Sequence, residues 1–137
     1  MQLVADANVL LSAVLGGRAA LVLRHHRVEQ VFTPAAAYDE VVEYLPSLAR
    51  KKRLDLDTLL LAFAALPVTV AERSEYEDKL PAARRRIAKR DPDDVDVLAL
   101  ALTLNLQVWT NDNDFEDSGV EWHTTAEFLK MLGIESS

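Results

Sequence analysis

Four acidic residues stand beside predicted strands and helices, where side chains from distant parts of a chain can meet. Asp6 follows the predicted short strand LVA, and Asp112 lies two residues after Thr110, the last residue of the predicted strand QVWT. Asp94 falls in the first turn of a predicted helix, and Glu40 lies on a helix that follows a third apolar run. Carboxylates that converge repel one another strongly unless a cation neutralises them. We therefore predict a shared cation site formed by these four acids.

The available side chains restrict which cation such a site would bind. The sequence has no cysteine, and none of its three histidines lies near the four acids. An all-oxygen set of ligands selects a hard divalent ion, which favours Mg²⁺ or Mn²⁺. These ions serve phosphodiester hydrolysis, because they polarise the phosphate and activate water. The sequence leaves open whether one ion or two would bind.

Each acid also has a simpler structural explanation. Asp6 could be an ordinary loop residue, and Asp112 lies in TNDND, a composition typical of turns. Asp94 could simply favour the positive end of its helix. Glu40 could be a surface glutamate, although it borders an apolar stripe of its helix. The prediction therefore depends on the four acids together. The stripe has helical spacing and consists of Ala36, Ala37, Val41 and Tyr44.

The elements that must position these acids alternate between short strands and helices. This alternation predicts an α/β fold with a mainly parallel sheet, in a single domain over residues 1–137. In such sheets, sites form beyond the carboxyl ends of the strands, where Asp6 and Asp112 are expected. Strands are predicted at residues 2–5, 30–33, 68–71, 107–110 and 120–123, and helices at residues 9–15, 18–26, 35–48, 58–66, 92–105 and 125–132, with a further helix ending near residue 90.

Three local signals predict where helices begin and end. Asp57 is expected to cap the helix at residues 58–66. Ser74 and Glu77 match a capping box for the helix that ends near residue 90. Pro46 is expected to kink or end the helix at residues 35–48, because proline removes one backbone hydrogen bond.

Composition excludes several classes of protein. Half of the residues are hydrophobic, which is enough for a core, and the absence of cysteine excludes a disulfide scaffold. The apolar run at residues 59–71 is too short to span a bilayer and contains Pro67. The apolar N-terminal segment is interrupted by Asp6, which is unlike a signal peptide. We therefore expect a cytoplasmic protein without a membrane segment.

The net charge of −7 opposes nucleic-acid binding, but the basic residues are clustered. Such clusters suit a basic rim around an acidic centre, and they suit solvated helix ends equally well. One cluster consists of Arg50, Lys51, Lys52 and Arg53, and the other of Arg84, Arg85, Arg86, Lys89 and Arg90.

Four segments resemble the motifs of the PIN-domain nuclease family, which includes the toxins of VapBC-type toxin–antitoxin pairs. The resemblance extends from Val4 to about Leu132 and implies a PIN-like three-layer sandwich, with a central sheet flanked by helices. The segments are VADANVLLSAVL, AAAYDEVVEYL, RDPDDVDVLALAL and VWTNDNDF.

The resemblance also implies roles for individual residues. It makes the four acids catalytic and metal-binding, with Asp114 as a further metal contact. The register leaves Asp39 or Glu43 as alternatives to Glu40, and Asp93 or Asp96 as alternatives to Asp94. The catalytic acids are Asp6, Glu40, Asp94 and Asp112, and the residues expected to orient ligands by hydrogen bonds are Asn8, Ser12 and Thr110.

The activity implied by the resemblance is Mg²⁺- or Mn²⁺-dependent cleavage of RNA, by a homodimer that an antitoxin protein would inhibit. Arg84, Arg85 and Lys89 would bind the RNA backbone, with residues 50–53 as the other basic candidates. The main alternative is a catalytically inactive PIN-like module that binds RNA or protein. A haloacid-dehalogenase-like phosphatase is disfavoured, since Asn8 stands where that family needs a second Asp. A receiver domain is disfavoured because no lysine lies between residues 90 and 130.

Overall fold

A five-stranded sheet forms the centre of the molecule. The computed structural model describes residues 1–87 and 94–134. The strand order is β3-β2-β1-β4-β5, and every neighbouring pair is parallel. This confirms the predicted α/β fold and its mainly parallel sheet. The strands are β1 (Gln2–Ala5), β2 (Gln30–Pro34), β3 (Thr69–Ala71), β4 (Gln107–Trp109) and β5 (Trp122–His123).

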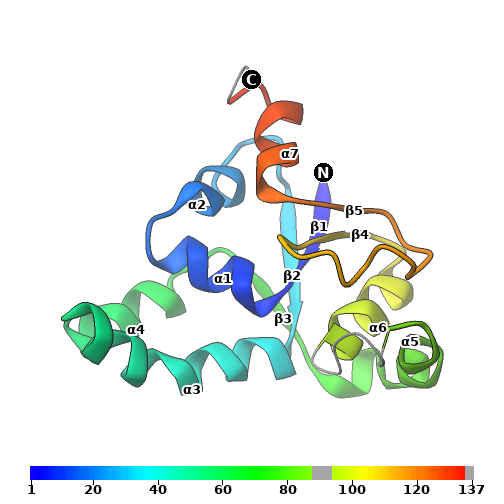
Figure 1. Cartoon of the computed structure of the whole chain (residues 1–137), viewed down its shortest axis with the longest axis horizontal. Helices are drawn as coiled ribbons and strands as arrows, with labels where there is room; N and C mark the ends of the chain where they lie inside the picture. Colours follow the sequence, from blue (N-terminus) through cyan, green and yellow to red (C-terminus); the bar gives the residue numbers. More distant parts are fainter. Residues whose placement is uncertain (88–93, 135–137) are drawn as a thin grey trace.

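Helices cover both faces of this sheet, as Figure 1 shows. One core includes residues of α1, α2, α4, α7 and most of α3, while a second core includes residues of α5 and α6. The three layers match the expected sandwich. The helices are α1 (Ala7–Val14), α2 (Arg18–Leu23), α3 (Ala35–Lys52), α4 (Leu56–Ala64), α5 (Leu80–Ile87), α6 (Val95–Leu104) and α7 (Thr125–Met131), with short 3-10 turns η1 (Arg73–Glu75) and η2 (Glu77–Lys79).

Alternation along β1 explains why the sheet has two cores. Leu3 and Ala5 pack into the core with α1 and α2, while Val4 packs into the core with α5 and α6. All three side chains are fully buried. A strand covered on both faces is apolar at every position, which is why the sequence shows short continuous apolar runs rather than alternation with polar residues.

Pro46 does not end α3, so that half of the prediction is wrong. The helix continues to Lys52 and ends at Arg53, which adopts a left-handed conformation. Leu45 before the proline and Leu48 after it are both buried in the same core. Burial of apolar side chains on both sides therefore outweighs the hydrogen bond that Pro46 removes.

Two predicted caps are wrong by a few residues. Asp55, not Asp57, caps α4, and its carboxylate accepts hydrogen bonds from the backbone and the hydroxyl of Thr58. A capping box forms at Glu72 and Glu75 rather than two residues later. In both regions several acidic or hydroxyl side chains are close in sequence, so composition alone does not identify which one begins the helix.

The apolar run at residues 59–71 divides between α4 and β3. Pro67 lies in the connection between these two elements, where its missing N–H group is tolerated. Within residues 1–87 and 94–134, we find no helix with the length and apolar character needed to cross a membrane.

Candidate active site

The site lies where the strand order of the sheet reverses. From β1 the chain proceeds to β2 and β3 on one side, whereas β4 and β5 lie on the other side. The connections after β1 and β4 therefore diverge, and their separation leaves a crevice at the carboxyl ends of the strands. Asp6 directly follows β1, and Asp112 lies in the loop after β4. Both acids are where the sequence predicted them.

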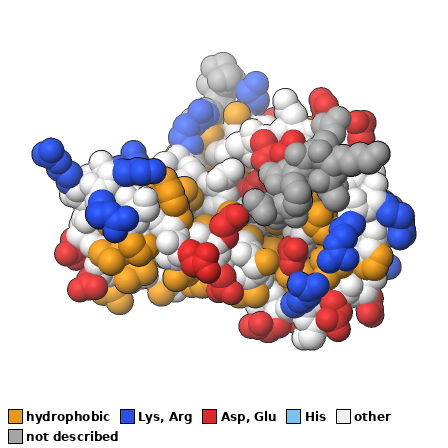
Figure 2. All heavy atoms as spheres, turned by 60° about the horizontal axis from the view of Figure 1, so that its bottom comes forward, with side chains coloured by type: hydrophobic (Ala, Val, Ile, Leu, Met, Phe, Trp, Pro, Cys, Tyr) orange, Lys and Arg blue, Asp and Glu red, His pale blue; other side chains and the backbone are white. Residues whose placement is uncertain are grey.

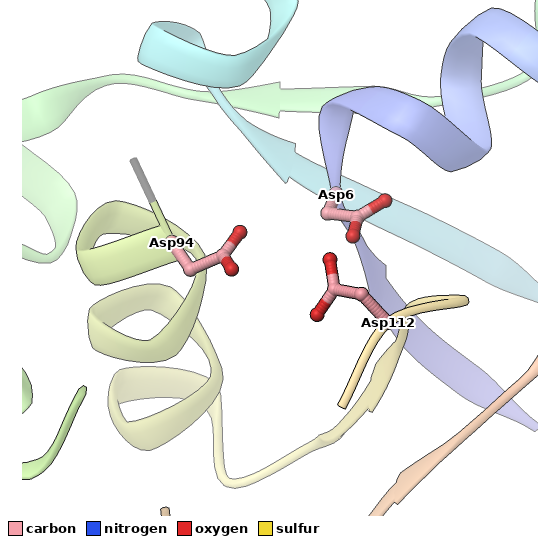
Figure 3. Close-up of side chains that lie close together, drawn as sticks. All are labelled: Asp6, Asp94 and Asp112. Atoms are coloured by element: carbon pink, nitrogen blue, oxygen red, sulfur yellow. The ribbon is translucent and has the colours of Figure 1, made fainter. Parts of the chain in front are cut away.

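Three aspartates from distant segments converge in this crevice. One carboxylate oxygen from each of Asp6, Asp94 and Asp112 lies within 4.8 Å of the others. Figure 3 shows Asp94 reaching from the start of α6 toward Asp6 and Asp112 at the ends of the central strands. Asp6 and Asp94 are buried and Asp112 is half-buried. α6 can deliver Asp94 here because it packs against β1, β2 and β4.

Hydrogen bonds hold both oxygens of Asp6. Its Oδ1 accepts a hydrogen bond of 2.9 Å from the backbone of Val9, so Asp6 is the N-cap of α1. Its Oδ2 accepts a hydrogen bond of 2.5 Å from the hydroxyl of Thr110. The backbone N–H of Asp112 in turn donates to the Thr110 hydroxyl oxygen at 3.4 Å. Thr110 therefore links two acids of the site.

Burial raises the pKa of Asp6 to about 6. This value already includes the hydrogen bonds from Thr110 and Val9, which lower the pKa, and the negative charges of Asp112 and Glu40, which raise it. A buried carboxylate beside other carboxylates is unfavourable until a cation shares their charge. Three convergent carboxylate oxygens are the donors that Mg²⁺ and Mn²⁺ prefer, so this set of residues fits either ion.

The structure distinguishes Asp94 from one of its two alternatives. Asp94 lines the cleft, whereas Asp96 lies outside its described lining. The carboxylate of Asp96 instead accepts a hydrogen bond of 2.6 Å from the hydroxyl of Tyr76. Asp93, the other alternative, lies outside the described residues.

Glu40 occupies the rim of the cleft rather than its floor. It is exposed, and it is not one of the three acids that converge. It nevertheless lines the cleft and contributes to the raised pKa of Asp6. The described lining contains neither Asp39 nor Glu43. The geometry therefore favours Glu40 among the three acids considered for this segment.

The cleft has a volume of about 450 Å³ and a mixed lining. Polar lining comes from the acids and from Asn8, which is exposed. The apolar lining includes Tyr44, which the sequence identifies only as part of an apolar stripe. Helical spacing indicates that Tyr44 is on the apolar side of its helix, but it does not show whether the side chain is buried or faces a cleft. The apolar residues of the lining are Ala7, Leu11, Ala37, Val41, Tyr44 and Val97.

Three residues expected to hold or orient the metal lie outside this lining, namely Ser12, Asp114 and Thr110, although Thr110 bonds directly to Asp6. Ser12 lines a separate hollow together with Arg18 and Thr125. Asp114 contacts the site through its backbone N–H, which donates a hydrogen bond of 3.0 Å to the Oδ1 of Asp112. The structure therefore brings Asn8 and Thr110 to the acids but directs Ser12 elsewhere.

Basic side chains lie on both sides of the acidic centre, as Figure 2 shows. Arg84 and Arg85 are exposed in the last turn of α5, and the other cluster forms the last turn of α3. The guanidinium of Arg86 donates a hydrogen bond of 2.8 Å to the backbone carbonyl of Ser118 and has a structural role. Lys89 lies outside the described residues.

Comparison with known proteins gives a family and a fold. A family model described as the PIN domain matches residues 4–133. No curated protein sequence matches this chain. The crystal structure of PAE2754 from Pyrobaculum aerophilum superposes with a TM-score of 0.72 at 16% identity, covering 98% of this chain and 91% of that chain.

Two further structures share the fold over nearly the whole chain. VapBC2 from Rickettsia felis, solved bound to a DNA fragment from its promoter, gives a TM-score of 0.65 at 11% identity, covering 90% of this chain and 98% of that chain. FitAcB from Neisseria gonorrhoeae gives a TM-score of 0.60 at 17% identity, covering 90% of this chain and 98% of that chain. At these identities the likeness is one of fold.

Proposed function

This chain belongs to the PIN-domain family, and on that premise we propose that it is a Mg²⁺- or Mn²⁺-dependent endoribonuclease. One observation carries the proposal. Asp6, Asp94 and Asp112, from three distant segments, place carboxylate oxygens within 4.8 Å of one another in an open cleft. A protein gains nothing in stability from burying such a group of like charges, so a bound cation is the economical explanation.

Asp6, Asp94 and Asp112 would hold the ion directly, and Glu40 would reach it from the rim through water. When bound, a divalent cation supplies Lewis-acid chemistry, which polarises the phosphodiester and lowers the pKa of water. Thr110 keeps Asp6 in one orientation through its hydrogen bond, and the backbone of Asp114 does the same for Asp112. Hydrogen bonds that orient metal ligands in this way increase the affinity for the metal.

Arg84 and Arg85 would contact RNA phosphates beside this site, as would the basic end of α3. Lys89 belongs to the same basic run in the sequence. The net charge of −7 makes the affinity for RNA weak and confines attraction to these basic patches. Binding should therefore weaken steeply as salt increases.

The resemblance to the toxins of VapBC-type pairs, together with the shared fold of VapBC2 and FitAcB, supports a role as the toxin of a toxin–antitoxin pair. Such a toxin would act in the cytoplasm as a homodimer, with an antitoxin protein as its inhibitor. A short neighbouring reading frame for a small DNA-binding protein would support this role, and co-purification of its product would test it.

The decisive experiment measures cleavage of single-stranded and structured RNA by purified protein with Mg²⁺, with Mn²⁺ and with a chelator. We expect cleavage that depends on the cation and is lost in Asp6→Asn. The matched control is Asp39→Asn, which removes one negative charge from an exposed position of α3 outside the cleft lining. Undiminished cleavage by Asp6→Asn would overturn the mechanism. Binding of RNA without cleavage by the wild type would indicate an inactive binding module.

A further inference from the structure

We propose that Tyr44 and Lys51 of α3 form a stacking platform for an unpaired nucleobase next to the phosphodiester that is cut. This inference rests on the proposed function and deepens it, because it assigns a base-binding position on α3 beside the site. It concerns the rim of the cleft rather than the three aspartates, so it can fail independently of the nuclease proposal.

The position of Tyr44 links the ring to the acidic site. Tyr44 lines the same cleft as Asp6, Asp94 and Asp112. It lies one helical turn beyond Glu40 on α3, a rise of about 6 Å along the helix axis. A ligand held at the aspartates would therefore extend over Tyr44 if it followed α3 along the rim.

The ring of Tyr44 is accessible in a way that the other tyrosine rings are not. The chain has three tyrosines. Tyr76 is buried and bonded to Asp96, and Tyr38 packs against Phe63 with 4.7 Å between ring centroids. Tyr44 is 37% exposed. An aromatic ring at a cleft wall with a free surface offers area on which a planar group can stack.

Lys51 holds a positive charge at the ring. Its ammonium lies 5.3 Å from the centroid of the Tyr44 ring, and it donates a hydrogen bond of 3.4 Å to the tyrosine hydroxyl. These two distances place the ammonium beyond the hydroxyl edge of the ring, so the contact leaves the face of the ring open to a base. It also places a cation on a rim that otherwise carries Glu40, where it can attract the phosphate attached to the stacked base.

The composition of the cleft favours a nucleobase over a bare phosphate. A cation and a phosphate need only the polar part of the lining, whereas the half-buried Leu11 adds accessible apolar surface to the cleft that Tyr44 lines. Apolar surface next to an aromatic ring suits a planar heterocycle. In an RNA duplex the bases are paired and stacked on one another, so only an unpaired nucleotide can present its face to the ring.

Binding tests the platform without relying on cleavage. The probe is a short single-stranded oligoribonucleotide containing 2-aminopurine, whose fluorescence falls when the base stacks. Asp112→Asn serves as the parent protein, so that the RNA stays intact. We expect Tyr44→Leu in this background to weaken binding roughly 10-fold and to remove the quenching. Tyr44→Phe and Tyr44→Trp should retain both, because each keeps a ring.

A pair of charge variants tests the part played by Lys51. Lys51→Gln should weaken binding several-fold, whereas Lys51→Arg should restore it by keeping a cation next to Tyr44. Lys130→Gln is the matched control, since it removes the same charge from an exposed position of α7 that belongs to neither basic cluster. Equal losses in Lys51→Gln and Lys130→Gln would overturn a specific role for Lys51.

Cleavage of an RNA with an abasic nucleotide beside the cut provides an independent test. The reference is the KM of the wild type on intact RNA. Removing the base from the RNA and removing the ring in Tyr44→Leu should each raise this KM by about the same factor. Tyr44→Leu should not distinguish the two substrates, because the ring and the base contribute through one contact.

The outcomes separate the two proposals. If the wild type cleaves RNA but Tyr44→Leu binds and cleaves as the wild type does, the platform is overturned and the nuclease proposal stands. If the wild type quenches the probe through Tyr44 but cleaves nothing, the platform stands and the nuclease proposal fails. If the wild type cleaves structured RNA but does not bind single-stranded RNA, the platform is overturned and the nuclease proposal stands. If it neither binds single-stranded RNA nor cleaves either kind of RNA, both are overturned.

Discussion

The floor and the rim of the cleft are built in different ways. The floor consists of Asp6, Asp94 and Asp112, which come from strand ends and a helix start and are largely buried. The rim consists of Glu40, Tyr44 and Lys51, which are exposed on one helix. Substitutions on the floor should therefore change chemistry and folding together, whereas substitutions on the rim should change affinity and leave the fold intact.

The sharpest test of this contrast uses two acids of the same helix start. Asp94→Asn should lower RNA cleavage more than 100-fold, because loss of a direct metal ligand should exceed the 10- to 100-fold cost of losing an outer contact. Asp96→Asn should retain most activity, since Asp96 bonds to Tyr76 outside the described cleft lining. Cleavage rates at saturating Mn²⁺ measure both. The reverse ranking would place the third acid at Asp96.

The second test measures how much the ionised Asp6 on the floor of the cleft lowers the stability of the metal-free protein. The folded pKa of Asp6 is about 6, above its ordinary value of 3.8. Protonated Asp6 therefore contributes stability that is fully present below pH 3.8 and is lost as pH rises through 6. Without metal, Asp6→Asn should be more stable than the wild type by about 3 kcal/mol at pH 7.5, roughly 100-fold in the folding equilibrium.

Urea unfolding in the presence of a chelator measures this difference, which should vanish near pH 3.5. Asp39→Asn is again the control and should change stability little at either pH. The same linkage predicts that Mn²⁺ raises the Tm of the wild type more at pH 7.5 than at pH 5, because protons compete with the ion for Asp6. An Mn²⁺ effect independent of pH would contradict a role for Asp6 as a ligand.

The third test removes a support of the floor without removing an acid. Thr110→Val deletes the hydroxyl that bonds to Asp6 while keeping a similar shape. We expect Mn²⁺ affinity to fall by 10-fold or more, in the range found for residues that orient metal ligands. Calorimetric titration of metal binding measures it. Unchanged affinity would show that burial and the Val9 bond alone orient Asp6.

The smallest effect on RNA binding is expected at the basic cluster on α5. Arg84→Gln with Arg85→Gln should weaken RNA binding a few-fold at moderate salt and reduce the slope of log affinity against log salt by about 1 to 2. Arg86→Gln is the informative comparison, because Arg86 bonds to the backbone of Ser118. That variant should lower Tm without a comparable change in the salt slope.

Strand ends were the most predictable part of the molecule. Asp6 and Asp112 lie where the sequence predicts because parallel strands bring their carboxyl ends to one edge; Asp6 directly follows β1, and Asp112 lies in the loop after β4. Asp94 and Asp96 could not be separated from sequence. Both lie in the first turn of one helix, and the difference depends on Tyr76, which a distant segment brings to Asp96.

Tertiary packing explains the remaining errors. The behaviour of Pro46 depends on core partners that hold α3 together on both sides of it. The exposure of Tyr44 depends on where the cleft opens, although its helical spacing matches that of buried neighbours. In each case the sequence reveals the periodicity of a helix. Whether the helix continues past a proline, and whether a side chain is buried or exposed, depends on the elements packed around that helix.

The pairing of β1 with β4 determines when the candidate site can be complete. Leu3 pairs with Gln107, so β1 acquires this neighbour only after the segments between them have been synthesised. A nascent polypeptide that ends before β4 also lacks Asp112. A growing chain on the ribosome, surrounded by RNA, therefore carries an incomplete set of acids until the loop after β4 has been made.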